Sequence, residues 1–99
     1  MAKQIAVNHP EVTRIILFGS VARNDFGVRS DLDLLVLLKS SHVPIRERIA
    51  GFLEECSGYP TDVFPLTEAE LELRLRNGDP FWMQALRDGI ECYRRGEIG

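Results

Sequence analysis

Apolar residues fall into short blocks along the chain, and the spacing within each block predicts its secondary structure. The blocks "TRIILF" at 13–18 and "DLDLLVLL" at 31–38 are rich in aliphatic residues and predict two strands. The second block is apolar on both faces in its later half, which is typical of a central strand covered on both sides. From 43 to 56 the apolar residues instead recur at helical spacing until Gly58, which predicts a helix.

Weaker patterns complete the list of elements. Residues 2–8 predict a short helix that ends before Pro10. The stretch "TDVFPL" at 61–66 predicts a short third strand, which Pro65 is expected to end. The alternating "IECYR" at 90–94 predicts a final edge strand.

Capping signals predict where the shorter helices begin. Ser20 is a good N-cap for one helical turn over 21–23. Thr67 and Glu70 have the spacing of a capping box, and the helix that they begin is expected to run to about residue 76. Asp79 and Pro80 occupy the N-cap and N1 positions of a last helix, which ends before residue 89.

This order of elements predicts the fold class. Helix, strand, short helix, strand, helix, strand, two helices and a strand make an α/β (α+β) fold, a small mixed sheet flanked by helices. A chain of 99 residues without repeats or linkers predicts one domain over 1–99.

Composition narrows the compartment and the partners. The net charge of −3 and the absence of a basic patch make direct nucleic-acid binding unexpected. The longest apolar run, 34–38, is far too short to span a membrane, and residues 1–15 lack a signal-peptide core, so a cytoplasmic protein without membrane association is expected. Cys56 and Cys92 predict two reduced, buried cysteines, although the sequence alone leaves a disulfide open.

Two aspartates interrupt the start of the second strand. Asp31 and Asp33 are two residues apart, so on a strand they point to the same face, roughly 6–7 Å apart. Carboxylate oxygens suit hard cations, above all magnesium. The pair predicts a shared cation, with a strand end open to water as the alternative.

A Gly-Ser turn lies at the end of the preceding strand. Gly19 lets the backbone approach a ligand, and the N–H groups that follow, with the Ser20 hydroxyl, form a seat for phosphate. If the two strands are neighbours, a metal-bound triphosphate would bridge this seat and the acidic pair. Asp62, on the third strand, could complete a two-metal site, although taken alone it resembles Asp79 and Asp88.

The stretch "GSVARNDFGVRSDLDLLV" at 19–36 resembles the signature of the DNA polymerase β-type nucleotidyltransferase superfamily. In particular it looks like the minimal nucleotidyltransferases, the MntA-type antitoxins encoded beside HEPN-domain toxins. The resemblance covers about residues 13–66, and it departs from the family at Asn24, where a glycine is common. Its motif residues, with the third family carboxylate in "PTDVFPLT", are Gly19, Ser20, Arg23, Ser30, Asp31, Asp33 and Asp62.

The resemblance implies a role for each carboxylate and for the turn. Gly19 and Ser20 would hold the triphosphate of ATP. Asp31 and Asp33 would ligate magnesium, with two ions expected, and Asp62 would be both a metal ligand and the base toward the acceptor hydroxyl.

Two motif residues keep alternative roles. Arg23 would either contact the phosphates or brace the loop by pairing with Asp25. Ser30 would either cap the loop or orient Asp31.

Three functions follow as hypotheses. The first is adenylylation of a hydroxyl, expected on a tyrosine of a HEPN-type toxin, which would make the chain an antitoxin. The second is a non-catalytic antitoxin that neutralises its partner by binding. The third is nucleotidyl transfer to RNA or a small molecule. The consecutive apolar residues at 81–83 cannot all face one side of a helix, so at least one would contact a partner unless the final segment covers it.

Overall fold

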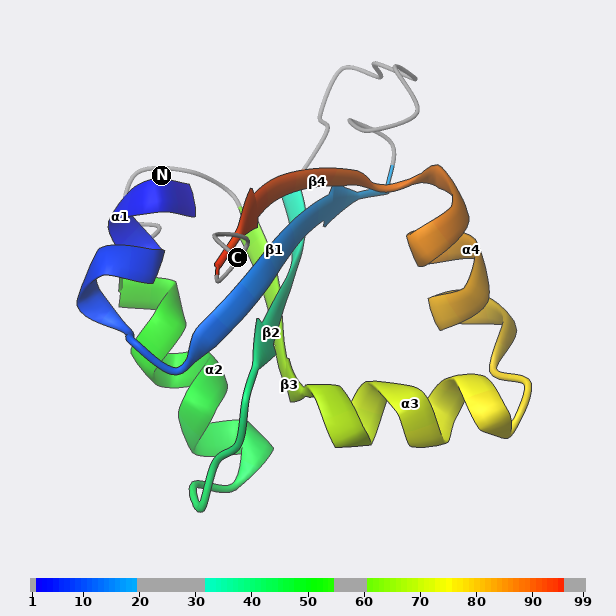
Figure 1. The fold of residues 1–99 in the computed structure, drawn as a ribbon, viewed down its shortest axis with the longest axis horizontal. Coiled ribbons are helices and arrows are strands. Elements are labelled where there is room, and N and C mark those ends of the chain that lie inside the picture. Colours follow the sequence, from blue (N-terminus) through cyan, green and yellow to red (C-terminus); the bar gives the residue numbers. More distant parts are fainter. Residues whose placement is uncertain (1, 20–31, 55–60, 96–99) are drawn as a thin grey trace.

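The computed structural model describes residues 2–19, 32–54 and 61–95, which form helices on both faces of a sheet. The elements are α1 (Ala2–Asn8), β1 (Val12–Phe18), β2 (Leu32–Leu38), α2 (Ile45–Leu53), β3 (Thr61–Thr67), α3 (Glu68–Arg76), α4 (Pro80–Asp88) and β4 (Ile90–Arg94). Figure 1 shows their arrangement. Within these described ranges, no helix combines the length and the apolar character needed to cross a membrane.

The strands form one four-stranded sheet in the order β3-β2-β1-β4. β1 is antiparallel to both β2 and β4, whereas β2 is parallel to β3. The predicted mixed sheet is therefore confirmed. β2 lies inside the sheet, and residues 34–38 are at most 2% exposed, as expected for a strand covered on both faces.

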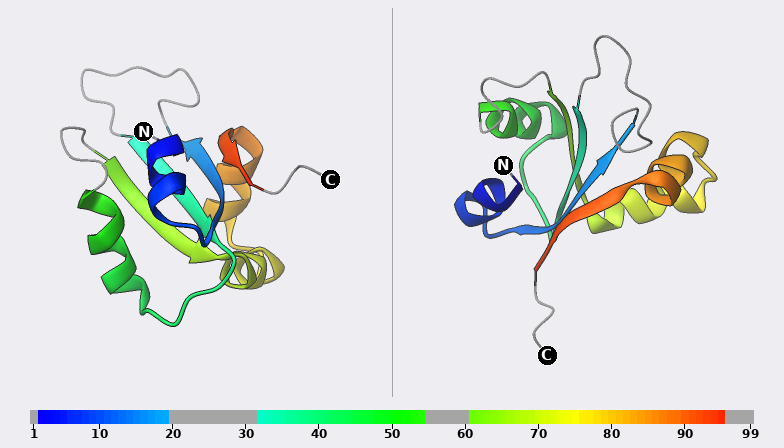
Figure 2. Two further views of the ribbon diagram at one scale, coloured as in Figure 1. Left: turned by 60° about the vertical axis from the view of Figure 1, so that its left-hand side comes forward. Right: turned by 90° about the horizontal axis from the view of Figure 1, so that it is seen from above.

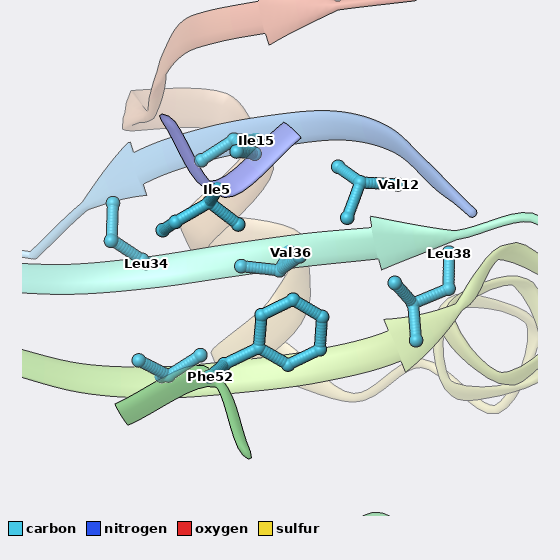
Figure 3. Close-up of a cluster of buried hydrophobic side chains, with 8 residues drawn as sticks. Ile5, Val12, Ile15, Leu34, Val36, Leu38 and Phe52 are labelled. Carbon is cyan, nitrogen blue, oxygen red and sulfur yellow. The ribbon is translucent and has the colours of Figure 1, made fainter. Parts of the chain in front are cut away.

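Helices cover both faces of the sheet. Figures 1 and 2 show α1 and α2 on one face and α3 and α4 on the other. The core on the first face (Figure 3) consists of Ile5, Val12, Ile15, Leu34, Val36, Leu38, Phe52 and Val63. The core on the second face consists of Ile16, Phe18, Leu35, Leu37, Leu66, Leu71, Trp82 and Ala85.

The predicted caps of α3 and α4 are both present. The Thr67 hydroxyl accepts a hydrogen bond from the Glu70 backbone N–H at 3.1 Å, and the Glu70 carboxylate accepts one from the Thr67 N–H at 2.8 Å. The Asp79 carboxylate accepts one from the Phe81 N–H at 3.0 Å, with Pro80 in the first turn. These local signals fix where both helices begin.

Two predicted boundaries were wrong. α2 begins at Ile45 and not at residue 43, because Pro44 is its N-cap and disfavours helical backbone in Val43. Pro65 does not end β3, which continues to Thr67. β3 is an edge strand of the sheet. A proline is tolerated there because its missing N–H can face away from the neighbouring strand.

The prediction of two buried cysteines was also wrong for Cys92, which is exposed. β4 is the other edge strand of the sheet, so its residues have fewer neighbours than those of β1 or β2. The Cys92 thiol donates a long hydrogen bond, 3.5 Å, to the Ile90 carbonyl. Cys56 lies outside the described residues.

Candidate active site

Gly19 and Asp33 meet where β1 ends and β2 begins. The antiparallel register pairs Phe18 with Asp33, which confirms that these strands are neighbours. Gly19 has a φ of +88°, a backbone conformation that other residues rarely adopt. A Cβ built on Gly19 would collide with the Asp33 carboxylate. The positive φ strains any other residue at this position, and an added Cβ would in addition push the Asp33 carboxylate aside.

Asp33 and Asp62 are adjacent across β2 and β3. They are Cα partners in the parallel register, so their side chains leave the sheet on the same side. Asp33 lies two residues from the buried Leu35, and Asp62 lies two residues from Phe64. Residues two apart on a strand share a face, so both carboxylates lie on the face covered by α3 and α4. Asp33 is half-buried, whereas Asp62 is exposed on the edge strand.

A cleft of about 360 Å³ opens between this end of the sheet and α4. Its volume lies within the range of small-molecule sites, about 300–1,000 Å³. The α4 residues along it have the spacing of one helix face. Its lining residues are Phe18, Gly19, Asp33, Phe81, Gln84, Ala85 and Asp88.

The donor set at this end of the sheet suits magnesium. Asp33 and Asp62 offer carboxylate oxygens on one face, and magnesium takes one or two protein carboxylates together with phosphate oxygens and water. Within residues 2–19, 32–54 and 61–95, no group of three or more His, Cys, Asp or Glu residues could hold a metal ion. The other predicted site residues, Ser20, Arg23, Ser30 and Asp31, lie outside these ranges.

The family model for the nucleotidyltransferase domain matches residues 1–85 of this chain. The chain belongs to the nucleotidyltransferase domain family. A search of curated proteins finds no match to this nucleotidyltransferase domain.

Solved structures share its fold. A proposed nucleotidyltransferase from Sulfolobus solfataricus superposes with a TM-score of 0.68 at 21% identity, over 97% of this chain and 76% of that one. A toxin–antitoxin structure with AMP-PNP superposes with a TM-score of 0.62 at 20% identity, over 97% of this chain and 73% of the matched chain. At these identities the likeness establishes a common fold.

Sequence reasoning missed the contribution of α4 to the cleft of this nucleotidyltransferase domain. The sequence motifs do not include Phe81, Gln84 or Asp88, and Asp88 is there only one of the carboxylates that Asp62 resembles. Their spacing of three and four residues shows that they share a helix face, which the sequence does reveal. That this face lies against Gly19 and Asp33 depends on long-range packing.

Aromatic packing holds α4 in place beside the carboxylates. The Trp82 ring is buried and lies 5.8 Å from the ring of Phe18 and 5.4 Å from that of Phe64. Phe18 precedes Gly19 in sequence, and Phe64 is two residues from Asp62. The same contacts that anchor the helix therefore fix the wall of the cleft relative to both acids.

The other end of β3 is held by a partly buried ion pair. The Arg48 guanidinium donates hydrogen bonds of 2.7 and 3.1 Å to the two oxygens of the Glu70 carboxylate and one of 3.0 Å to the Pro65 carbonyl. The hydrogen bonds from Arg48 to the carboxylate are the largest cause that lowers the pKa of Glu70 from its usual 4.5 to about 2. The pair ties α2 to α3 across the edge strand that carries Asp62.

Proposed function

We propose that this nucleotidyltransferase domain transfers AMP from ATP to a hydroxyl group of a protein partner, a tyrosine of a HEPN-type toxin, and thereby acts as its antitoxin. The observation that carries the proposal is the meeting of Gly19, Asp33 and Asp62 at one end of the sheet, beside a cleft of nucleotide size. The fold shared with a toxin–antitoxin structure with AMP-PNP supports both the nucleotide and the partner.

In this proposal the nucleotide occupies the cleft. Gly19 has no side chain, so its backbone lets phosphate come close to the Asp33 carboxylate. Ser20 and Arg23 follow in the motif and would contact the phosphates, and Ser30 would orient Asp31.

Asp31, Asp33 and Asp62 are the residues that would hold two magnesium ions. When bound, such ions neutralise phosphate charge and favour in-line displacement at phosphorus. Asp33 would act from inside the cleft, and Asp62 from the exposed edge.

Asp62 also serves as the general base. The acceptor hydroxyl gives its proton to the Asp62 carboxylate while its oxygen bonds to the α-phosphorus of ATP. The bond from that phosphorus to the oxygen bridging to the β-phosphate breaks, and pyrophosphate leaves with the electron pair. AMP remains on the acceptor as a phosphodiester.

The exposure of Asp62 favours a large acceptor. Asp62 lies on edge strand β3 and, among the described residues, is not one that lines the cleft. A side chain presented by another protein can reach it from outside while ATP occupies the cleft. RNA is less favoured because the chain carries a net charge of −3. A reaction that consumes ATP in this way belongs in the cytoplasm.

Labelled ATP tests the proposal. The chain is incubated with magnesium and a HEPN-domain protein, with ATP labelled at the α-phosphate or at the γ-phosphate. We expect label on the partner only from α-labelled ATP. Asp62→Asn should abolish labelling, whereas Glu72→Gln, which removes an exposed carboxylate on α3, should leave it intact.

The same experiment separates the alternatives. Label on RNA or on a small molecule would show that the acceptor is not a protein. Neutralisation of the toxin by Asp62→Asn, without any label, would favour a non-catalytic antitoxin that acts by binding.

A further inference from the structure

Phe81 is half-exposed although it sits in an aromatic cluster. Its ring lies 4.8 Å from that of Trp82, 5.8 Å from that of Phe18 and 5.9 Å from that of Phe64, yet 51% of the residue remains accessible. Phe81 also lines the cleft that contains Asp33. It is a rigidly supported aromatic surface beside the candidate phosphate seat.

The ends of α4 lie toward different parts of the cleft. Gly89, next to Asp88, packs against the backbone of Leu17, and Ile90 pairs with Leu17 in the sheet, so this end of α4 is near Gly19. Phe81 lies seven residues before Asp88, about 10 Å away along the axis of α4. A nucleotide whose phosphates lie at Gly19 therefore has its base toward Phe81.

We propose that Phe81 and Gln84 form the adenine subsite of the cleft, with the base stacked on the Phe81 ring and its edge bound by the Gln84 amide. This inference rests on the proposed function, because it assigns the base of the same nucleotide. Gln84 follows Phe81 by one helical turn and lines the same cleft, so both side chains can reach one base.

The chemistry of Gln84 selects adenine over guanine. A carboxamide offers N–H donors and one carbonyl acceptor side by side. Adenine presents an N6 amino donor next to the N7 acceptor, which a glutamine pairs with in a bidentate manner, whereas guanine presents two acceptors there. Bound ATP is thus matched at Gln84, and GTP would place an acceptor against the amide carbonyl.

Calorimetric titration with three probes tests this subsite: Mg-ATP, Mg-GTP and magnesium tripolyphosphate, which lacks ribose and base. Stacking of one base is lost in an alanine variant, so Phe81→Ala should weaken Mg-ATP binding by roughly 5- to 150-fold. The same variant should leave tripolyphosphate binding unchanged. Phe81→Trp should keep ATP affinity, because indole is also a stacking surface.

Two more variants complete the design. Met83→Ala removes another exposed apolar side chain of α4, 45% accessible and absent from the described lining of the cleft, and should not change ATP binding. Gln84→Met keeps the length of the side chain but removes both the donor and the acceptor, so it should abolish the preference for ATP over GTP.

The outcomes separate this inference from the proposed function. Equal weakening of ATP and tripolyphosphate by Phe81→Ala, or no weakening of either, would overturn the adenine subsite while leaving nucleotide binding in place. Loss of toxin binding by Phe81→Ala with unchanged ATP affinity would assign the ring to the partner instead. If the unmodified chain binds tripolyphosphate and ATP with equal affinity, no base subsite exists; if it binds neither, the proposed function fails as well.

Discussion

Gly19 and Asp33 approach so closely that a Cβ on Gly19 would overlap the Asp33 carboxylate. Their proximity joins the end of β1 to the start of β2, and it brings the proposed phosphate seat next to the proposed metal ligand. The φ of +88° favours glycine here, and any larger residue would also displace the Asp33 carboxylate.

Gly19→Ala should therefore abolish ATP binding and destabilise the fold. A non-glycine residue in this conformation costs roughly 1–2 kcal/mol, and displacement of Asp33 adds to that. Urea unfolding and ATP titration measure the two effects separately.

Gly78→Ala is the matched control for this substitution. Gly78 also has a positive φ, +76°, but a Cβ there would meet no atom within 4 Å. We expect Gly78→Ala to lose roughly 1–2 kcal/mol for its backbone alone and to keep ATP binding. Equal behaviour of the two variants would argue against a special role for the Gly19–Asp33 contact.

Asp62→Asn should stabilise the chain when magnesium is absent. Like charges opposite each other on neighbouring strands destabilise a sheet, so removing one of the Asp33–Asp62 pair should raise the free energy of unfolding by up to about 1 kcal/mol. Added magnesium should stabilise the unmodified chain more than the variant. Urea unfolding with EDTA and with magnesium measures both effects.

A surface carboxylate provides the comparison for Asp62→Asn. Glu72 pairs with Arg76 at 2.8 Å on the exposed side of α3, so Glu72→Gln should lose a few tenths of a kcal/mol under either condition. If Asp62→Asn were instead less stable than the unmodified chain in EDTA, the carboxylates would not repel each other as their register implies.

The acid sensitivity of folding should depend on Glu70. Its pKa is about 2 in the folded chain, against a usual 4.5, because Arg48 donates two hydrogen bonds to it. A folded-state pKa below the unfolded one gives stability that is complete above about pH 4.5 and is lost as pH falls toward 2. Allowing for its partial exposure, we expect Glu70 to contribute about 1–2 kcal/mol of that loss.

Glu70→Gln removes this titration but retains the carbonyl oxygen that accepts from Thr67. The unfolding free energy of the variant should fall less steeply between pH 4.5 and 2. Glu91, whose pKa is lowered chiefly by a hydrogen bond from Arg94, titrates in the same direction in both proteins and cancels in the comparison. Parallel pH profiles would show that the Arg48 pair does not control acid unfolding.

Local signals in the sequence predicted most of the elements. The Thr67–Glu70 capping box and the Asp79 cap are satisfied by residues within four positions, so they can be read without knowing the fold. The apolar run of β2 likewise predicted a buried central strand, because the same residues on an edge strand would be exposed to water at a cost in free energy. The Gly-Ser and Asp-x-Asp motifs predict that Gly19 and Asp33 lie at one end of the sheet, where the register places them together.

Long-range packing set what the sequence did not predict. Strand order alone decides that Pro65 and Cys92 lie on edge strands, where the former does not stop its strand and the latter is exposed. The position of α4 over Asp33 depends on the burial of Trp82 against Phe18. No pattern within residues 80–88 identifies that contact, so the wall of the cleft could not be predicted.

Removal of magnesium should weaken ATP binding at least tenfold. The triphosphate would enter a cleft that contains the Asp33 carboxylate, with Asp62 next to it in register. Two like unit charges 4 Å apart repel by about 1 kcal/mol in bulk water and by about 4 kcal/mol near a protein surface. Titration of ATP in magnesium and in EDTA measures this difference. Asp33→Asn reduces the repulsion, so it should weaken binding in magnesium yet bind ATP in EDTA no worse than the unmodified chain does. Equal affinity of the unmodified chain with and without magnesium would exclude a metal-dependent site at these carboxylates.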